Sequence, residues 1–280
     1  MEAGDRDAAV RAVAKDGDPD RYAASLFVPP EARAPLFALL AFNVELARIA
    51  GLVKEAQLGE IRLQWWREAL ARGLAGEATG HPVADAIAAA AHACGLPAKG
   101  LGELIDARHF DVSMRRMPDE AALDDYLDKT AGTLFRLTAK IVDPALTAQV
   151  IDNAAKTAGA AYGLTGLMRA LPVHLSQGRV DLPEDALRRH GVAASALLTG
   201  EGSEGLNALL RAWRDKARAA LAAANQEIAA LAPHARSAFL PLALVEPYLA
   251  AVERTSDPLR EVATINPLYR LWRLRTYRFR

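Results

Sequence analysis

Apolar residues recur along most of the chain at the three- and four-residue spacing that places them on one side of an α-helix. In residues 31–52 the positions on one such side are Ala34, Phe37, Ala38, Ala41, Phe42 and Glu45. Ala and Leu, which are strong helix formers, dominate the pattern, and the short alternating runs of strands are missing. The same spacing predicts helices at residues 59–75, 82–93, 99–110, 118–142, 146–170, 206–232, 237–252 and 267–275. The pattern therefore predicts an all-α protein.

The longest irregular segment is PVHLSQGRVDLP, residues 172–183. Because a proline stands near each end, we expect the preceding helix to end before Pro172. Long structureless connections in compact domains often serve as lids or binding loops. A glycine-rich break at 199–205 is too short for an interdomain linker. We therefore expect a polar N-terminal segment, residues 1–20, followed by one domain, residues 21–280.

Composition and charge exclude several classes of protein. The chain has 280 residues, enough for a sizeable core, and its 34 basic and 34 acidic side chains argue against a general nucleic-acid-binding protein. Cys94 is the one cysteine, which excludes an intramolecular disulfide or a cysteine-based zinc site. The acid-rich first twenty residues are unlike a signal or transit peptide, and no apolar run is long enough to span a membrane. We therefore expect a cytoplasmic protein.

Two groups of acidic and histidine side chains have spacings that metal sites use. Glu120, Asp124 and Asp128 recur every four residues, but they follow a predicted helix start, where acids are favoured by the helix dipole. Asp106 and His109 share a helix face, whereas Asp111 points away from it. A solvated or ion-paired helix end explains both groups better than a metal does, so no metal ligand is assigned.

Aromatic and basic residues gather at two places. Trp65 and Trp66 are adjacent and about 100° apart on a helix, so one can face the core while the other faces a pocket or a partner. Residues 270–280 contain five Arg and no acid, interleaved with Leu, Trp, Tyr and Phe. Arginines at the end of a helix can bind its free carbonyl groups. The alternation of basic and aromatic residues also suits contact with the anionic inner face of the cell membrane. The candidates for contact with a membrane or a protein partner are Trp272, Arg273, Arg275 and Arg278.

Four segments resemble, in order, the squalene/phytoene synthase family, and they cover residues 21–51, 59–70, 124–137 and 158–183. Family members are all-α isoprenoid synthases that join two prenyl diphosphates, so the resemblance implies a single-domain helical bundle around a central cavity. The segment DDYLDKTAGTLFRL is similar to the family's Tyr-x4-Ala-Gly segment. This similarity makes Tyr126 the candidate catalytic residue.

The chain departs from the family where the family's enzymes bind metal. By the resemblance, the aspartates of the first motif are replaced at Ala47-Arg48 and Gly51, and those of the second motif at Ala170 and His174. Arg169 is kept, and Arg21-Tyr22 replaces a Ser-Phe pair. Without these carboxylates nothing evident holds Mg²⁺ against a diphosphate leaving group.

One branch of the family, which contains an assembly factor for mitochondrial respiratory complex I, shares these losses. The resemblance implies a non-canonical protein that binds an isoprenoid or lipid, or that assists assembly of a respiratory complex, with no cofactor. The alternative is a prenyl-diphosphate transferase with relocated ligands and Mg²⁺. A peripheral membrane scaffold is the third possibility. The pocket candidates are Arg21, Tyr22, Glu45, Arg48, Asp106, Arg169, His174 and Arg179. Expected partners are an isoprenoid or lipid-like ligand and a respiratory-complex subunit or membrane surface, but no nucleic acid.

Overall fold

A computed structural model of the chain describes residues 3–113 and 116–279, and within them it contains helices and no strand. The all-α prediction is therefore confirmed. The helices are α1 (Ala3–Gly17), α2 (Pro19–Ser25), α3 (Pro30–Ala47), α4 (Ile49–Leu52), α5 (Ala56–Leu74), α6 (Pro82–Cys94), α7 (Ala98–Val112), α8 (Glu120–Leu127), the π-helix η1 (Asp128–Gly132), α9 (Thr133–Val142), α10 (Ala148–Ser176), α11 (Glu184–Arg189), α12 (Ala194–Leu198), α13 (Glu204–Ala229), the 3₁₀-helix η2 (Ala235–Leu244), α14 (Val245–Arg254) and α15 (Pro267–Thr276).

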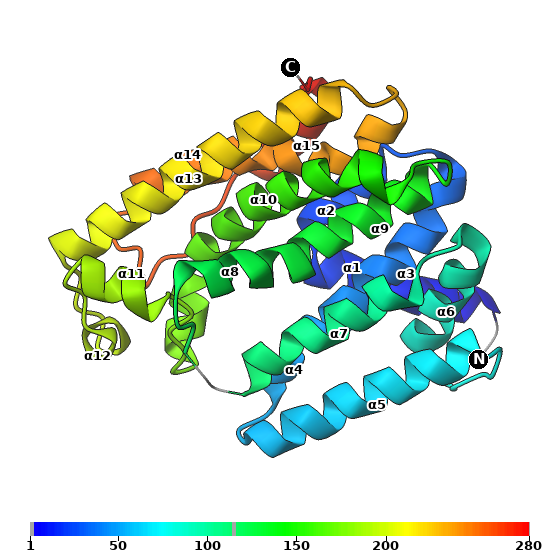
Figure 1. The fold of residues 1–280 in the computed structure, drawn as a ribbon, viewed down its shortest axis with the longest axis horizontal. Helices are drawn as coiled ribbons and strands as arrows, with labels where there is room; N and C mark the ends of the chain where they lie inside the picture. Colours follow the sequence, from blue (N-terminus) through cyan, green and yellow to red (C-terminus); the bar gives the residue numbers. More distant parts are fainter. Residues whose placement is uncertain (1–2, 114–115, 280) are drawn as a thin grey trace.

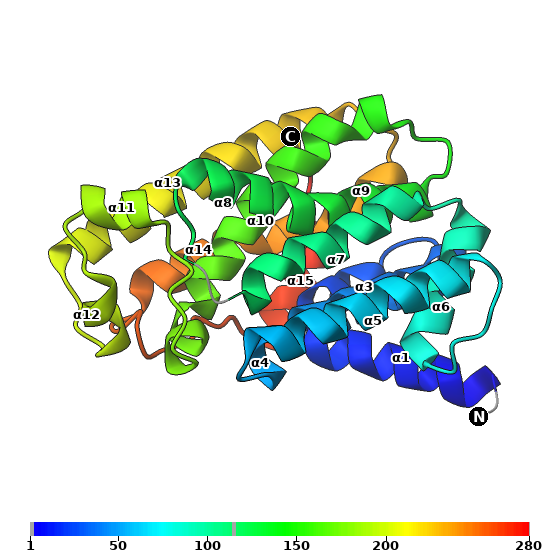
Figure 2. The ribbon, with the colours of Figure 1, turned by 60° about the horizontal axis from the view of Figure 1, so that its bottom comes forward.

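The long helix α10 lies in the middle of the bundle, and α13 packs along it (Figure 1). The N-terminal helices form a second group, in which α3 contacts α1 and α6, and α5 contacts α6 and α7. Figure 2 shows α1, α5 and α6 together at one side of the molecule. The groups meet where α9 packs between α3 and η2. Large, fully buried side chains fill the interior, among them Phe42, Phe135, Trp213 and Phe239.

One predicted helix end is wrong. Helix α10 continues through Pro172 and ends at Ser176, so the irregular connection covers residues 177–183 and not 172–183. A proline inside a helix removes one backbone hydrogen bond. Leu171, Pro172 and Leu175 are all buried, and the packing of this last part of α10 outweighs the lost bond.

The described part of the polar N-terminal segment is helical and packs on the rest of the chain. Helix α1 contacts α3 and α6, and Val10 and Ala14 on it are buried in the main core. The division of the chain at residue 20 stays a prediction, but residues 3–20 bury apolar surface against the same core as the later helices.

A single π-helical turn, η1, joins α8 to α9. π-helices are rare and occur frequently at functional sites. Here the turn lies against α10 at very close range. A Cβ atom added to Gly159 on α10 would lie 2.5 Å from the backbone N of Gly132 in η1. Gly159 therefore allows the π turn to approach α10.

A buried carboxylate ties the N-terminal part of the chain to the C-terminal part. Asp20, on α2, is 4% exposed. Its Oδ1 lies 2.9 Å from Tyr248 Oη and 2.9 Å from Arg270 Nε, and its Oδ2 lies 3.3 Å from Arg169 Nη1. The Arg169 guanidinium also covers the Tyr248 ring at 3.4 Å from its centroid. Helices α2, α10, α14 and α15 thus share one polar cluster.

By length and composition, one stretch of the described chain, Ala235–Arg254, could cross a membrane. It comprises η2 and α14, and 72% of its apolar window is buried inside the fold. That burial is typical of a core helix of a soluble protein.

Candidate functional site

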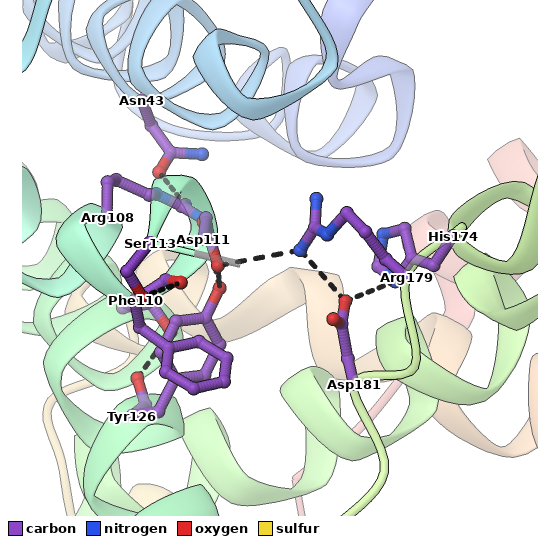
Figure 3. A network of polar contacts seen from close by, with 10 residues as sticks. Asn43, Arg108, Phe110, Asp111, Ser113, Tyr126, His174, Arg179 and Asp181 are labelled. Carbon is purple, nitrogen blue, oxygen red and sulfur yellow. Dashed lines mark hydrogen bonds and ion pairs between the residues drawn. The ribbon is translucent and has the colours of Figure 1, made fainter. Parts of the chain in front are cut away.

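A polar cluster joins α7, α8 and α3 (Figure 3). Arg108 and Asp111 are one helical turn apart on α7, and Arg108 Nη1 donates to Asp111 Oδ2 at 2.9 Å. The Tyr126 hydroxyl, on α8, donates to Asp111 Oδ1 at 2.9 Å and accepts from Arg108 Nη1 at 3.1 Å. Arg108 Nη2 donates to Asn43 Oδ1 on α3 at 3.0 Å. The two charges of this cluster are therefore paired with each other.

A second cluster comes from the end of α10 and the connection that follows it. Asp181 Oδ2 lies 2.7 Å from His174 Nδ1 and 3.0 Å from Arg179 Nη2. Arg179 points across to the first cluster, with Nη2 3.9 Å from Asp111 Oδ1 (Figure 3). The two clusters therefore face each other, and the ion pair between Arg179 and Asp111 links them.

Burial and charge set the protonation of the side chains in these clusters. Burial, together with the negative charge of Asp111, raises the pKa of the Tyr126 phenol well above its ordinary value. The hydroxyl is therefore protonated at neutral pH and acts as a donor. Burial alone would raise the pKa of Asp181, but the hydrogen bond from His174 and the charge of Arg179 outweigh it and lower that pKa. Asp181 is therefore an anion at neutral pH.

The clusters line a cavity of about 250 Å³ between α2, α3, α7, α8, η1 and α10. Apart from Arg21 and Tyr162, the rest of its wall consists of small or apolar side chains. Ala47 on α3 and Ala170 on α10 both face it. These are positions at which the resemblance to squalene/phytoene synthases places metal-binding aspartates. The cavity wall therefore carries methyl groups there and no carboxylate.

Arg21 brings a further guanidinium into the wall of the cavity. Its Cζ atom stacks 4.1 Å from the centroid of the Tyr162 ring and lies 5.8 Å from that of Phe135. Its Nη1 pairs with Asp18 Oδ2 at 2.9 Å. Burial and the charge of Asp18 both raise the pKa of the Tyr162 phenol, so this ring too is neutral. An arginine therefore occupies space between aromatic rings at this end of the cavity.

The cavity brings together four of the residues proposed from the sequence, namely Tyr126, Arg21, His174 and Arg179. Tyr22 faces away from it, into a groove between α1, α3 and α6, where its hydroxyl accepts a hydrogen bond from Arg11 Nε at 2.7 Å. Glu45 is buried and pairs with Arg48 at 2.6 Å, and neither is part of the cavity lining.

Two other proposed pocket residues also lie outside the cavity. Asp106 is on the outer side of α7, where its Oδ1 pairs with Arg67 Nη2 at 2.6 Å. The same guanidinium lies 3.2 Å from His109 Nε2, so Asp106 and His109 do share a face, as the spacing predicted. Arg169 belongs to the Asp20 cluster.

The acidic residues of α8 and of the start of η1 form ion pairs. Asp124 binds Lys216, Asp125 binds Lys129, and Asp128 binds Arg136, each at 2.7 Å. Throughout residues 3–113 and 116–279, no three His, Cys, Asp or Glu side chains are arranged to hold a metal ion. Of the three acids spaced every four residues, Glu120 alone lies in the first turn of α8, where the helix dipole favours an acid.

The C-terminal candidates divide between two sides of α15. Trp272, Arg275 and Arg278 are exposed, whereas Arg273 turns inward, and its Nε donates to the Ala243 carbonyl at 3.3 Å. Arg280, the last of the five arginines, lies outside the described residues. The tryptophan pair divides as expected, because Trp66 is buried against Phe42 while Trp65 is largely exposed.

Sequence reasoning missed several residues of the cavity. These are Asn43, Arg108, Asp111, Tyr162 and Asp181. Asp111 was seen to point away from the Asp106 face, but the spacing does not say what lies on the other side of α7. The i,i+3 pairing of Arg108 with Asp111 and the Arg-x-Asp spacing of 179–181 were the available signals.

Sequence comparisons relate the chain to one protein family. The model described as squalene/phytoene synthase matches residues 14–275. The human protein named NADH dehydrogenase (ubiquinone) complex I, assembly factor 6 is 28% identical over 257 residues, which are 90% of this chain and 77% of the human protein. Phytoene synthase of Thermus thermophilus is 30% identical over 203 residues, which are 71% of this chain and 66% of that enzyme.

Solved structures show the same fold. The squalene synthase HpnC from Alicyclobacillus acidocaldarius superposes with a TM-score of 0.77 at 23% identity, covering 89% of this chain and 93% of that one. A dehydrosqualene synthase solved with a ligand superposes with a TM-score of 0.83 at 18% identity, covering 97% and 94%. The expected isoprenoid-synthase-like bundle around a central cavity is therefore confirmed as the fold.

Proposed function

Because this chain belongs to the squalene/phytoene synthase family, we propose that it no longer condenses prenyl diphosphates and instead assists assembly of a respiratory NADH dehydrogenase, complex I. Relatives that match it over most of its length carry the name of a complex I assembly factor. The observation that carries the proposal is the pair of alanines, Ala47 and Ala170, at the cavity wall. Methyl groups cannot coordinate Mg²⁺, which needs oxygen ligands.

The carboxylates that do face the cavity are already paired. Asp111 is held by Arg108 and Tyr126, and Asp181 by Arg179 and His174. A metal would have to displace these donors to reach the oxygens. Three arginines and two aspartates line the wall, so the lining offers a cation no excess of negative charge. We therefore expect that the protein binds no Mg²⁺.

The size and lining of the cavity support the same proposal. At about 250 Å³ it is smaller than the roughly 300–1,000 Å³ of typical small-molecule pockets. Condensation of two prenyl diphosphates needs room for two apolar chains. Arg21 also places a guanidinium, and not apolar surface, in the wall that such a chain would contact. If the cavity binds an isoprenoid or lipid, we expect one short chain and no reaction.

The catalytic part of the proposal is tested with purified protein, farnesyl or geranylgeranyl diphosphate, and Mg²⁺. We expect no release of diphosphate above that of a Tyr126→Phe variant, while a phytoene synthase assayed in parallel releases it. Release that depends on Tyr126 would instead support the alternative, a prenyl-diphosphate transferase with relocated ligands.

Metal binding is tested separately by thermal unfolding with and without millimolar Mg²⁺. A ligand present at 100 times its Kd adds about 2.7 kcal/mol, which raises Tm by several degrees in a chain of this size. We expect a change below about 1 °C. A larger rise in Tm that is reversed by an excess of EDTA would contradict the absence of a metal site.

The assembly part of the proposal is tested in the organism whose genome encodes the protein. Deleting its gene should lower the amount of assembled complex I on native gels and the NADH:quinone activity of isolated membranes. Succinate:quinone activity, which does not need complex I, is the internal control. Re-expression of wild type and of Tyr126→Phe should restore complex I equally. Normal complex I in the deletion strain would reject the assembly role.

A further inference from the structure

Helix α15 presents large apolar side chains to solvent. Leu268 is 77% exposed and Trp272 is 56% exposed, and Tyr269 and Leu271 are also exposed. The rings of Tyr269 and Trp272 stack with centroids 5.6 Å apart. Soluble proteins seldom leave such residues together on one short helix without a function for them. We call these four residues the outer face of α15.

The opposite side of α15 is firmly packed, so the outer face is held in place. Leu274 is buried in a small apolar cluster with residues of α2, η2 and α14. Arg270 pairs with the buried Asp20, and Arg273 bonds the Ala243 carbonyl. Asn266 caps the helix by accepting hydrogen bonds from the N–H groups of Leu268 and Tyr269. The exposure therefore belongs to an ordered helix and not to a frayed end.

The chain segment that carries the outer face has basic but no acidic side chains. Residues 262–279 contain no acidic side chain. Arg275 and Arg278 are exposed at the C-terminal end of the same helix and just beyond it. Arginines beside Leu, Trp and Tyr form the residue set of helices that lie in the interface of a lipid bilayer. The cations complement the anionic headgroups of such a surface.

We propose that α15 docks this protein on an anionic membrane, with its outer face in the interface and Arg275 and Arg278 on the headgroups. A ten-residue helix is about 15 Å long, so it lies along the surface and does not cross the bilayer. The proposal is independent of the assembly role, because it rests on the exposed face and charge of α15. A protein that covers the same face is the competing occupant, and the experiment below separates the two.

The test is flotation of the full chain with vesicles of phosphatidylcholine containing about 30% phosphatidylglycerol, compared with vesicles of phosphatidylcholine alone. We expect binding to the anionic vesicles at about 0.15 M salt and at least tenfold weaker binding to the neutral ones. Raising the salt concentration should weaken binding to the anionic vesicles.

Variants locate the contact. Replacing Arg275 and Arg278 by Gln should weaken binding about fivefold for each arginine. Leu268→Ser with Trp272→Ser should weaken it at least about tenfold, because the apolar face is lost. The matched controls are Leu58→Ser with Ile61→Ser, which removes exposed apolar residues from α5, and Arg62→Gln with Arg188→Gln, which removes exposed charges elsewhere. Controls should bind as wild type does, and all variants should keep the wild-type circular dichroism and Tm.

Fluorescence gives a second readout that does not depend on weakened binding. Trp272→Phe keeps an aromatic ring on the outer face but removes one of the four tryptophans. Brominated lipids should quench wild-type fluorescence and quench that of Trp272→Phe much less, while both proteins float equally well.

Two results would overturn the proposal. One is wild-type protein that stays unbound to anionic vesicles, or that binds them no better than neutral ones. The other is wild-type affinity for anionic vesicles in both double variants, Arg275→Gln with Arg278→Gln and Leu268→Ser with Trp272→Ser. Concentration-dependent self-association that Leu268→Ser with Trp272→Ser abolishes, together with no vesicle binding, would assign the outer face to a second copy of the chain.

Discussion

At the scale of single residues, the central cavity is defined by buried charges that satisfy one another. Arg108 and Asp111 are both nearly inaccessible to solvent and depend on each other. Removing water from two charges costs free energy, which their attraction offsets only while both are present. The loss of one partner leaves the other charge buried and uncompensated. Replacing either residue of the pair should therefore destabilise the protein, whatever the cavity binds.

Asp111→Asn should lower the free energy of unfolding by about 3 kcal/mol, because Arg108 loses its counter-ion. Tyr126→Phe removes one hydrogen bond and leaves the ion pair, so about 1 kcal/mol is expected. Asp124→Asn, in a half-exposed pair with Lys216, is the control and should cost less than about 1 kcal/mol. Urea unfolding measures all three, and equal effects of Asp111→Asn and Asp124→Asn would contradict the buried pair.

Asp181 should make stability depend on pH in the acid range. Its folded-state pKa is lowered below the ordinary value of 3.8, so its contacts stabilise the protein above that pH. The contribution is lost as the pH falls through the lowered pKa, because the protonated carboxyl no longer attracts Arg179. Asp181→Asn should therefore be less stable than wild type at neutral pH, with the difference closing well below pH 4 in urea unfolding. A difference that stays constant down to that range would show that the charge of Asp181 is unimportant.

The roles of these residues could be predicted only in part from the sequence. The resemblance identified Tyr126, Arg21, His174 and Arg179, and all four line the cavity. Arg108, Asp111 and Asp181 were not assigned to it. Helical spacing tells which residues of α7 share a face, but not which other helix that face meets. The contacts of Arg108 reach Asn43, 65 residues earlier, and no local pattern contains that pairing.

At the scale of elements, the π turn η1 depends on a close approach between backbones. Gly159→Ala would put a Cβ atom 2.6 Å from Gly132 Cα, and backbone cannot move aside as a flexible side chain can. We expect a loss of about 2 kcal/mol in the free energy of unfolding. Gly166→Ala, on the same helix with nothing within 4 Å, is the matched control. It should be neutral or gain up to about 1 kcal/mol, because Ala favours a helix more than Gly does. Equal effects of the two substitutions would show that the approach to η1 is not tight.

The positions of the longer helices after residue 30 followed from periodicity, whereas α1, α2, α11 and α12 were not predicted and a local rule placed the end of α10 wrongly. The predicted helix at 118–142 is observed as α8, η1 and α9 in continuous succession, and the spacing gave no sign of the π turn. The end of α10 was placed before Pro172 by a rule about isolated helices. In the folded chain Leu171 and Leu175 are buried, and their packing carries the helix one turn past the proline.

At the scale of the whole molecule, α1 behaves as part of the core. Val10→Ala should lower the free energy of unfolding by about 2 kcal/mol, because Val10 is 4% exposed between α1 and the later helices. Val150→Ala, at a 53% exposed position, should change it by less than about 0.5 kcal/mol. Circular dichroism and tryptophan fluorescence should report one shared transition for Val10→Ala. A separate early transition would mean that residues 3–17 fold independently.

The Asp20 cluster sets the order in which the chain can complete its fold during synthesis. Asp20 leaves the ribosome early, but Tyr248 is made 228 residues later and Arg270 later still. At roughly 5–20 residues per second, this carboxylate waits on the order of 10–50 s for partners that permit its burial. Until then α2 can pack only on its early neighbours α1 and α3, and its contacts with η2 and α15 are missing. We therefore expect the newly made N-terminal half to lack part of its final packing, and to be open to non-native contacts, until α15 has emerged.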